Sequence, residues 1–192
     1  MRQPVIIDFE TKKSFRETSK HQELGISVAC AYDYKQGAYL LFEEHELTKL
    51  FKLLEEASIV IGFNIDGFDL PVIQAYYPGD VTQFATFDIL TDIKNKLGRR
   101  IRLDNVAQAT LNQGKSGHGL QAIALYREGK LDELKKYCQD DVRITKELLE
   151  YGAQHGHIYY TDIVDKKQIK VSWEKYLAYK SDSKSVSLTL PF

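Results

Sequence analysis

The sequence predicts a mixed α/β fold: one sheet, begun by three antiparallel strands and continued by parallel strands, with helices on both faces. Three observations support this fold class. Strand-like runs at residues 4–10, 25–34 and 37–44 follow one another with polar or glycine-bearing connections. Short apolar runs then alternate with helical periodicity, and helical patterns dominate the part of the chain that follows.

Each later element is predicted from its apolar spacing and its flanking residues. Asp104 and Asp132 are expected to cap the helices near whose starts they lie, because a carboxylate there accepts hydrogen bonds from free backbone amides. The predicted helices span residues 43–57, 68–76, 104–111, 118–128 and 131–151, and the further strands span 58–64, 85–93, 157–164 and 167–173.

Length and composition limit the organisation of the chain. Its 192 residues are enough for one substantial core. We expect one domain over residues 1–153, a strand pair packed on or beside it over 154–180, and a flexible polar tail over 181–192. The 26 basic and 27 acidic residues give a net charge of -1, so any nucleic acid must be held by a local basic patch.

The cysteines and the apolar runs predict the environment of the protein. Cys30 and Cys138 lack the close spacing of a thiolate metal site and are expected to be reduced, packed thiols. No apolar run approaches the ~20 residues of a membrane helix, and no leader-like segment opens the sequence. We therefore expect a soluble, cytoplasmic protein that does not bind membranes.

Acidic residues occur in three places that a fold could bring together. Asp8 and Glu10 are one residue apart in the first predicted strand, so both side chains project from the same face. Asp69 follows the fourth predicted strand, and Tyr137 and Asp141 lie about one turn apart on a predicted helix. Each pattern alone is common on protein surfaces, whereas the ordered set predicts a shared site.

The ordered motifs DFE, NIDGFD and YCQDD resemble those of the DEDD 3'-5' exonucleases. Lys136 stands where the histidine-bearing branch has its histidine, so the tyrosine-bearing branch, which includes the proofreading domain of family-B DNA polymerases, is the better match. The resemblance covers residues 5–150 and implies a ribonuclease H-like fold.

The same resemblance implies a site and an activity. Asp8, Glu10, Asp69 and Asp141 would hold two divalent metal ions, Mg²⁺ or Mn²⁺, and Tyr137 would position the attacking water. Hard cations prefer oxygen ligands, and a pair of them stabilises the attacking and leaving oxygens at phosphorus. We expect hydrolysis of single-stranded ends from 3' to 5', with DNA favoured over RNA, in DNA repair or replication. A ribonuclease, a structure-specific endonuclease and a non-catalytic nucleic-acid-binding module remain alternatives.

Other signals have two interpretations each. Asp88 either touches the metal site or, as we favour, is a hydrogen-bonded acid at a helix start. The histidines His155 and His157 either bind metal or, as we favour, are exposed at a helix end. The segment QGKSG lacks the preceding strand and the first glycine of a phosphate-binding loop, so triphosphate hydrolysis is not predicted.

Candidate nucleic-acid contacts come from polar, basic and aromatic side chains near these motifs. The basic run at residues 94–102 is either a phosphate-binding patch or a solvated turn. The candidate contacts are Asn64, Phe68, Arg99, Arg100, Lys115 and His118.

The C-terminal segment SLTLPF resembles the hexapeptides with which bacterial replication and repair proteins dock on the sliding clamp. Leu188, Leu190 and Phe192 match the apolar positions, while Ser187 replaces the usual leading glutamine. The alternative is an edge strand packed on the same chain.

Overall fold

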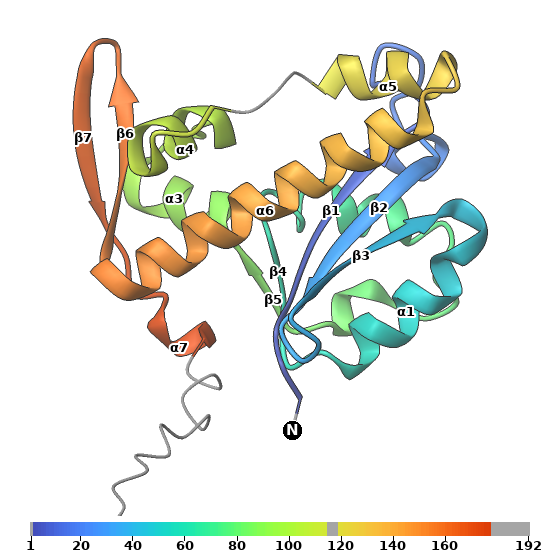
Figure 1. Cartoon of the computed structure of the whole chain (residues 1–192), viewed down its shortest axis with the longest axis horizontal. Coiled ribbons are helices and arrows are strands. Elements are labelled where there is room, and N and C mark those ends of the chain that lie inside the picture. Colours follow the sequence, from blue (N-terminus) through green and yellow to red (C-terminus); the bar gives the residue numbers. More distant parts are fainter. Residues whose placement is uncertain (1, 115–118, 178–192) are drawn as a thin grey trace, which may run out of the picture.

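The computed structural model describes residues 2–114 and 119–177, which form a five-stranded sheet, seven α-helices and a separate hairpin (Figure 1). The sheet has the order β3-β2-β1-β4-β5. Strands β1 (Val5–Thr11), β2 (Ile26–Asp33) and β3 (Ala38–Glu43) are antiparallel, whereas β4 (Val60–Gly62) and β5 (Thr86–Asp88) extend the sheet in parallel from β1. The predicted mixed sheet is therefore confirmed.

Strand β1 occupies the middle of the sheet because apolar side chains cover both of its faces. Val5, Ile7 and Phe9 join the core on one side, and Ile6 joins the core on the other. Asp8 and Glu10 share the face of Ile6, because side chains alternate along a strand. This face lies under the longest helix, residues 131–155. The two strand acids therefore lie beneath a helix that carries a third acid, Asp141.

Helices cover both faces of the sheet, as predicted. Helices α1 (Leu47–Glu56) and α2 (Asp69–Ile73) pack on one side. On the other side lie α3 (Ile89–Leu97), α4 (Leu103–Leu111), α5 (Gly119–Arg127) and α6 (Leu131–His155). Helix α6 crosses the sheet diagonally in Figure 1, and α7 (Glu174–Leu177) packs against it.

The described part of the chain contains no helix that is both long enough and apolar enough to cross a membrane.

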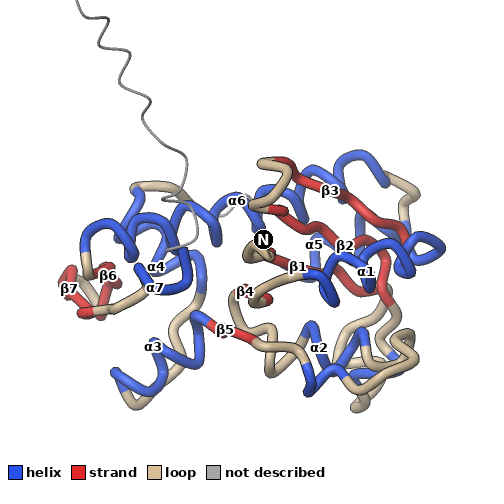
Figure 2. Tube along the Cα trace, turned by 90° about the horizontal axis from the view of Figure 1, so that it is seen from below, coloured by secondary structure: helices blue, strands red, loops and turns tan. Residues whose placement is uncertain are grey.

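The hairpin of β6 (His157–Asp162) and β7 (Asp165–Lys170) lies apart from the five-stranded sheet, beside α4 (Figure 2). Side chains of α4 form hydrogen bonds with the backbone groups at the free edge of β6. Asn105 bonds the backbone of Thr161 in both directions at 2.8 Å, and Thr110 does the same for Tyr159 at 2.9 and 3.0 Å. The hairpin therefore belongs to the same core, as its buried Ile158 and Ile169 show.

Several predicted boundaries are wrong by a few residues, and local hydrogen bonds explain two of them. The strand predicted over 85–93 ends at Asp88, because that carboxylate accepts from Leu90 and Thr91 and starts α3. The first predicted cap, Asp104, lies inside the first turn of α4, and Asp132 lies inside the first turn of α6. Helix α6 continues past residue 151 to its cap at Gly156, which has φ of 70°.

Candidate active site

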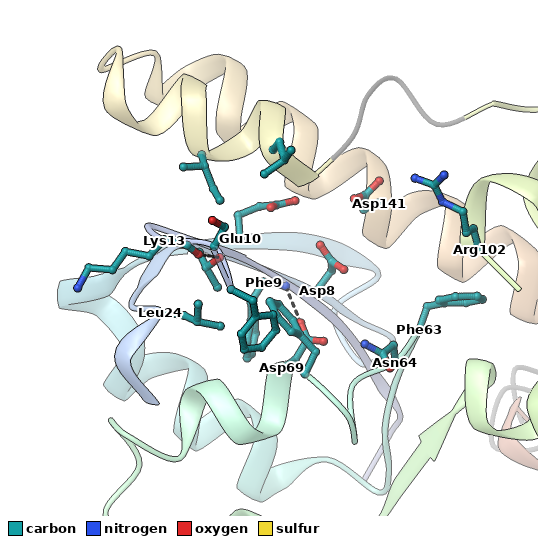
Figure 3. A pocket seen from close by; sticks show the side chains of 16 residues that line it. Asp8, Phe9, Glu10, Lys13, Leu24, Phe63, Asn64, Asp69, Arg102 and Asp141 are labelled. Carbon is teal, nitrogen blue, oxygen red and sulfur yellow. Dashed lines mark hydrogen bonds between the residues drawn. The ribbon is translucent and has the colours of Figure 1, made fainter. Parts of the chain in front are cut away.

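Three carboxylates meet where β1 passes beneath α6. One oxygen from each of Asp8, Glu10 and Asp141 lies within 4.8 Å of the others. Glu10 is 8 % exposed and Asp141 is 2 % exposed, so water screens these charges poorly. Figure 3 shows Asp8 and Glu10 on the strand below and Asp141 on the helix above them. The spacing and the hard oxygen donors fit a divalent cation, which would offset the repulsion among the three groups.

Asp69 lines the same pocket but does not belong to this group of three. It begins α2, is 3 % exposed, and accepts a hydrogen bond of 2.9 Å from the backbone N–H of Phe9. Burial raises the pKa of the Asp69 carboxyl well above its usual range, and the Asp8 carboxylate raises it further. A cation nearby would favour the ionised form of Asp69.

The pocket around the acids has a volume of about 610 Å³ and two kinds of wall. Asp8, Glu10, Asp69 and Asp141 lie on its acidic side, and Lys13 and Arg102 contribute positive charge. Its apolar wall consists of Phe9, Phe15, Leu24, Phe63, Phe68, Leu120 and Ile123. Such a pocket can hold a charged group against the acids while an aromatic or apolar group contacts the other wall.

The aromatic part of that wall is a cluster of rings. Phe15 lies 6.0 Å from Phe68 and 4.9 Å from His21, in edge-to-face contacts measured between ring centroids. Phe15 is 50 % exposed although it is large and apolar. Its exposed ring is therefore available to a ligand at the mouth of the pocket.

Asp88 is a structural acid, as we favoured from the sequence. Its carboxylate accepts hydrogen bonds from Asn64 N at 2.8 Å and Asp66 N at 3.2 Å, besides the two amides at the start of α3. Asn64 has φ of 72°, a conformation that non-glycine residues rarely adopt. Asp88 thus fixes the turn that leads from β4 to Asp69.

Replacing Asp88 by alanine is expected to destabilise the protein by about 2–4 kcal/mol, because a helix cap and two further partly buried amides lose their acceptor. Asp88→Asn keeps one acceptor oxygen and is expected to lose about 1 kcal/mol. Urea denaturation of both variants measures these costs. Equal, negligible losses would mean that water replaces the carboxylate at this turn.

The structure places only some of the predicted nucleic-acid contacts at the pocket. Asn64 and Phe68 line the pocket, and Arg100 donates a hydrogen bond of 2.6 Å to Asn64 Oδ1. Arg99 instead pairs with Asp162 of the hairpin at 2.8 Å, away from the pocket lining. The other two predicted contacts, Lys115 and His118, lie outside the described residues.

Tyr137 is not among the residues that line the acidic pocket. Its side chain is 4 % exposed within the core. It lines a separate depression of about 300 Å³ with Gln121 and Leu125 of α5 and with Lys136 and Asp140. The predicted role in positioning water therefore stays a prediction.

Both cysteines are free and buried, as expected. Cys138 Sγ lies 3.3 Å from the backbone oxygen of Asp8, and Cys30 is opposite Asp8 in the β1–β2 register. Burial, and next the Asp8 carboxylate, raise the pKa of both thiols. The thiols therefore pack as neutral groups beneath the candidate site.

Sequence analysis missed several residues of the pocket. Arg102 was predicted only as a member of the basic run, whereas Lys13 and Phe15 lie just beyond β1 and were not predicted. Their position after the first acids was a usable signal. Leu120 and Ile123 come from α5 and carried no signal, because a helix with apolar residues is ordinarily interpreted as core.

In this mixed sheet, the central strand and the helix that crosses it carry carboxylates that lie close together. This arrangement is that of a ribonuclease H-like domain with a candidate metal site. A family model described as the RNase H superfamily matches residues 5–152, and the chain belongs to this superfamily. Membership supports a nuclease activity that uses divalent metal ions.

The solved structures include a similar fold. The crystal structure of Trypanosoma brucei RNase D superposes with a TM-score of 0.58 at 16 % sequence identity. The match covers 78 % of this chain and 57 % of that one, so the chain spans little more than half of the RNase D structure. No curated protein matches the sequence.

Proposed function

We propose that the protein is a metal-dependent 3'-5' exonuclease that removes nucleoside 5'-monophosphates from single-stranded ends, with DNA favoured. The observation that supports this most directly is the group of three carboxylates, within 4.8 Å of one another, in an open pocket of a domain of the RNase H superfamily. The tyrosine-bearing DEDD branch is the proposed subtype, because the motifs occur in its order along the chain.

Asp8, Glu10 and Asp141 would hold divalent ions, Mg²⁺ or Mn²⁺, with Asp69 beside them. When bound, such ions supply Lewis acidity toward the oxygens on phosphorus. Their proposed number is two, because four carboxylates around one pocket would balance two such ions. The protein itself supplies the rigid strand and helix that keep the ligands in place.

The remaining pocket residues would position the end of a strand. Lys13 and Arg102 offer positive charge to phosphate oxygens, and Arg102 has the planar fork that binds them in pairs. Phe15, Phe68 and Leu120 offer an apolar wall to a base or sugar. A single strand fits this arrangement, because an unpaired base can turn toward that wall without breaking a base pair.

Ribonuclease activity is the second candidate. The similar solved structure is named an RNase D, and neither the carboxylates nor the apolar wall distinguishes ribose from deoxyribose. An endonuclease with the same site and a non-catalytic binding module remain alternatives. Clustered, poorly screened acids cost stability, which argues against the binding module.

The deciding experiment is degradation of end-labelled single-stranded DNA and of the matching RNA with Mg²⁺, Mn²⁺ or chelator. A ladder that shortens from the 3' end only with metal supports the proposal, and the faster substrate identifies the sugar. Internal fragments would favour the endonuclease. Intact strands under every condition would reject a nuclease.

Changing Tyr137 to phenylalanine is expected to slow cleavage by about tenfold to a hundredfold, because the hydroxyl is lost while the ring still fills the core. Single-turnover rates with Mn²⁺ measure this effect, and the thermal midpoint serves as a control for folding. An unchanged rate would remove Tyr137 from the mechanism.

The proposed cellular setting is cytoplasmic DNA repair or replication. Leu188, Leu190 and Phe192 lie outside the described residues, so docking on a sliding clamp stays a prediction. The boundaries at residues 153 and 180 likewise stay a prediction.

A further inference from the structure

One face of the β6–β7 hairpin carries rings and lysines and no acid. Residues directly opposite in an antiparallel pair share a face, and alternate residues of each strand do so too. The register therefore places His157, Tyr159 and Thr161 on one face with Lys170, Gln168 and Lys166, their respective partners. Both acids of the hairpin, Asp162 and Asp165, fall on the other face.

The ring-bearing face points outward. Its opposite face holds Ile158, Tyr160 and Ile169, which are 0 %, 7 % and 3 % exposed within the core. Lys166, Gln168 and Lys170 are exposed, and Tyr159 is half-buried. On the inward face, Asp162 is paired with Arg99 at 2.8 Å and with Lys167 at 2.6 Å. The outward face is thus positively charged at one end of an almost neutral protein.

Four rings continue from the end of α6 onto this face, and we call them the ring row: Tyr151, His155, His157 and Tyr159. Tyr151 stacks on His155 with centroids 4.0 Å apart, and His157 contacts Tyr151 at 6.0 Å and Tyr159 at 5.1 Å. The Lys166 ammonium lies 4.3 Å from the Tyr159 centroid. The four rings therefore form a row of ring contacts, with Lys166 and Lys170 of the neighbouring strand beside it.

The histidines of the ring row are oriented by the backbone. His155 Nδ1 lies 2.9 Å from Tyr151 O, and His157 Nδ1 lies 2.9 Å from His155 O. These carbonyls hold both rings, and neither histidine belongs to a metal-ligating group among the described residues. Both rings thus lie at the end of α6 with one nitrogen close to a backbone carbonyl, and His155 is exposed while His157 is half-buried.

We propose that the ring row, with Lys166 and Lys170, binds single-stranded nucleic acid outside the metal centre. Partly exposed rings, such as these, can stack on bases of any sequence, and lysines without an acid on their face attract phosphates. The choice of nucleic acid as the occupant rests on the proposed nuclease function. A protein partner is less favoured, because the paired residues of this face include no large aliphatic side chain of the kind that fills protein interfaces, and the exposed Ile163 and Val164 lie in the turn beyond it.

This surface would extend substrate binding well beyond the pocket. Asp141 and Tyr151 lie ten residues apart on α6, which corresponds to about 15 Å along the helix axis. A strand must therefore span several nucleotides before it can contact both places. The surface should increase the affinity for long strands and leave short ones unaffected.

The test is the affinity for fluorescein-labelled strands of about twenty and about four deoxythymidines, measured by fluorescence anisotropy with chelator to prevent cleavage. The first variant is Lys166→Glu with Lys170→Glu, and the second is Tyr159→Ala. Lys35→Glu with Lys52→Glu is the matched control, because it reverses two exposed lysines elsewhere on the surface. Circular dichroism and the thermal midpoint check that each variant folds.

Both hairpin variants are expected to bind the long strand at least about tenfold more weakly than the control, with no difference for the short strand. The double lysine variant should also reduce the slope of log affinity against log salt by about 1.4, since each lost phosphate contact contributes about 0.7. Equal affinities and slopes for this variant and the control would overturn the proposal.

The result is independent of whether the protein cleaves. If the native protein degrades nothing and the hairpin variants still lose affinity, the nuclease proposal fails and the binding surface stands. If cleavage occurs and the hairpin variants bind long strands as the control does, only the binding surface is rejected.

Discussion

Asp8→Ala is expected to abolish metal-dependent cleavage, with a loss of at least about a thousandfold in the single-turnover rate. The change removes the acid that is grouped with Glu10 and Asp141 and whose charge also acts on Asp69. Several kcal/mol of charge stabilisation at phosphorus would be lost with the metal, and each 1.36 kcal/mol is a factor of about ten.

The matched control for this variant is Asp140→Ala. Asp140 neighbours Asp141 on α6 but lines the separate depression beside Tyr137 and pairs with Arg143 at 3.3 Å. The variant Asp140→Ala is expected to cleave the substrate at the native rate. Comparable losses in the two variants would mean that the acidic pocket is not the site of the reaction.

The stability of the Asp8 variant provides an independent readout. In the absence of metal, removing one of several poorly screened carboxylates relieves repulsion, so the thermal midpoint should not fall. Adding Mn²⁺ should raise the midpoint of the native protein and of Asp140→Ala, since a ligand that binds only the folded state stabilises it. The same addition should raise the midpoint of Asp8→Ala much less.

The acids could be predicted from the sequence because each depends on local structure. The strand that carries Asp8 and Glu10 has alternating faces, and the helix that carries Asp141 has a regular period. Their order along the chain then related them to one family. No such rule places the apolar wall, since Leu120 and Ile123 come from a helix distant in sequence whose direction is set only by tertiary packing.

The basic run shows the same limit over a shorter distance. Arg99 and Arg102 are three residues apart, yet Arg99 pairs with the hairpin and Arg102 lines the pocket. The segment between α3 and α4 has no regular period, so its side-chain directions could not be read from spacing. Gly98, with φ of 73°, ends α3 immediately before this segment.

Asp88 illustrates how a buried acid near a site can be structural. The sequence left two roles for Asp88, a metal contact and a helix start. The hydrogen-bond donors around its carboxylate distinguish the two. Amides of the turn after β4 and of the start of α3 surround its carboxylate. Backbone amides provide hydrogen-bond donors to both oxygens of Asp88, whereas Asp8, Glu10 and Asp141 face one another.

Gly62→Ala is expected to destabilise the protein by about 3 kcal/mol, at the upper end of the cost of overpacking a core. A Cβ at this position would lie 2.2 Å from Ile65 Cγ2 and 2.8 Å from the backbone oxygen of Ile7. Ile65 is fully buried, and Ile7 belongs to the central strand immediately before Asp8. Neither neighbour can yield without moving the turn after β4 or β1 itself.

The same variant links the fold to the site. Because the strain falls on the backbone that carries Asp8 and on the turn that leads to Asp69, the folded fraction of Gly62→Ala should also cleave more slowly than the native protein.

Gly98→Ala is the matched control: its φ of 73° costs about 1–2 kcal/mol in an alanine, but among the described residues no heavy atom beyond its chain neighbours lies within 4 Å of the new Cβ. Urea denaturation and single-turnover rates of both variants separate crowding from backbone strain. If Gly62→Ala loses stability but retains the native rate, the strand that carries Asp8 and Glu10 tolerates displacement. Cleavage would then not depend on a rigid central strand.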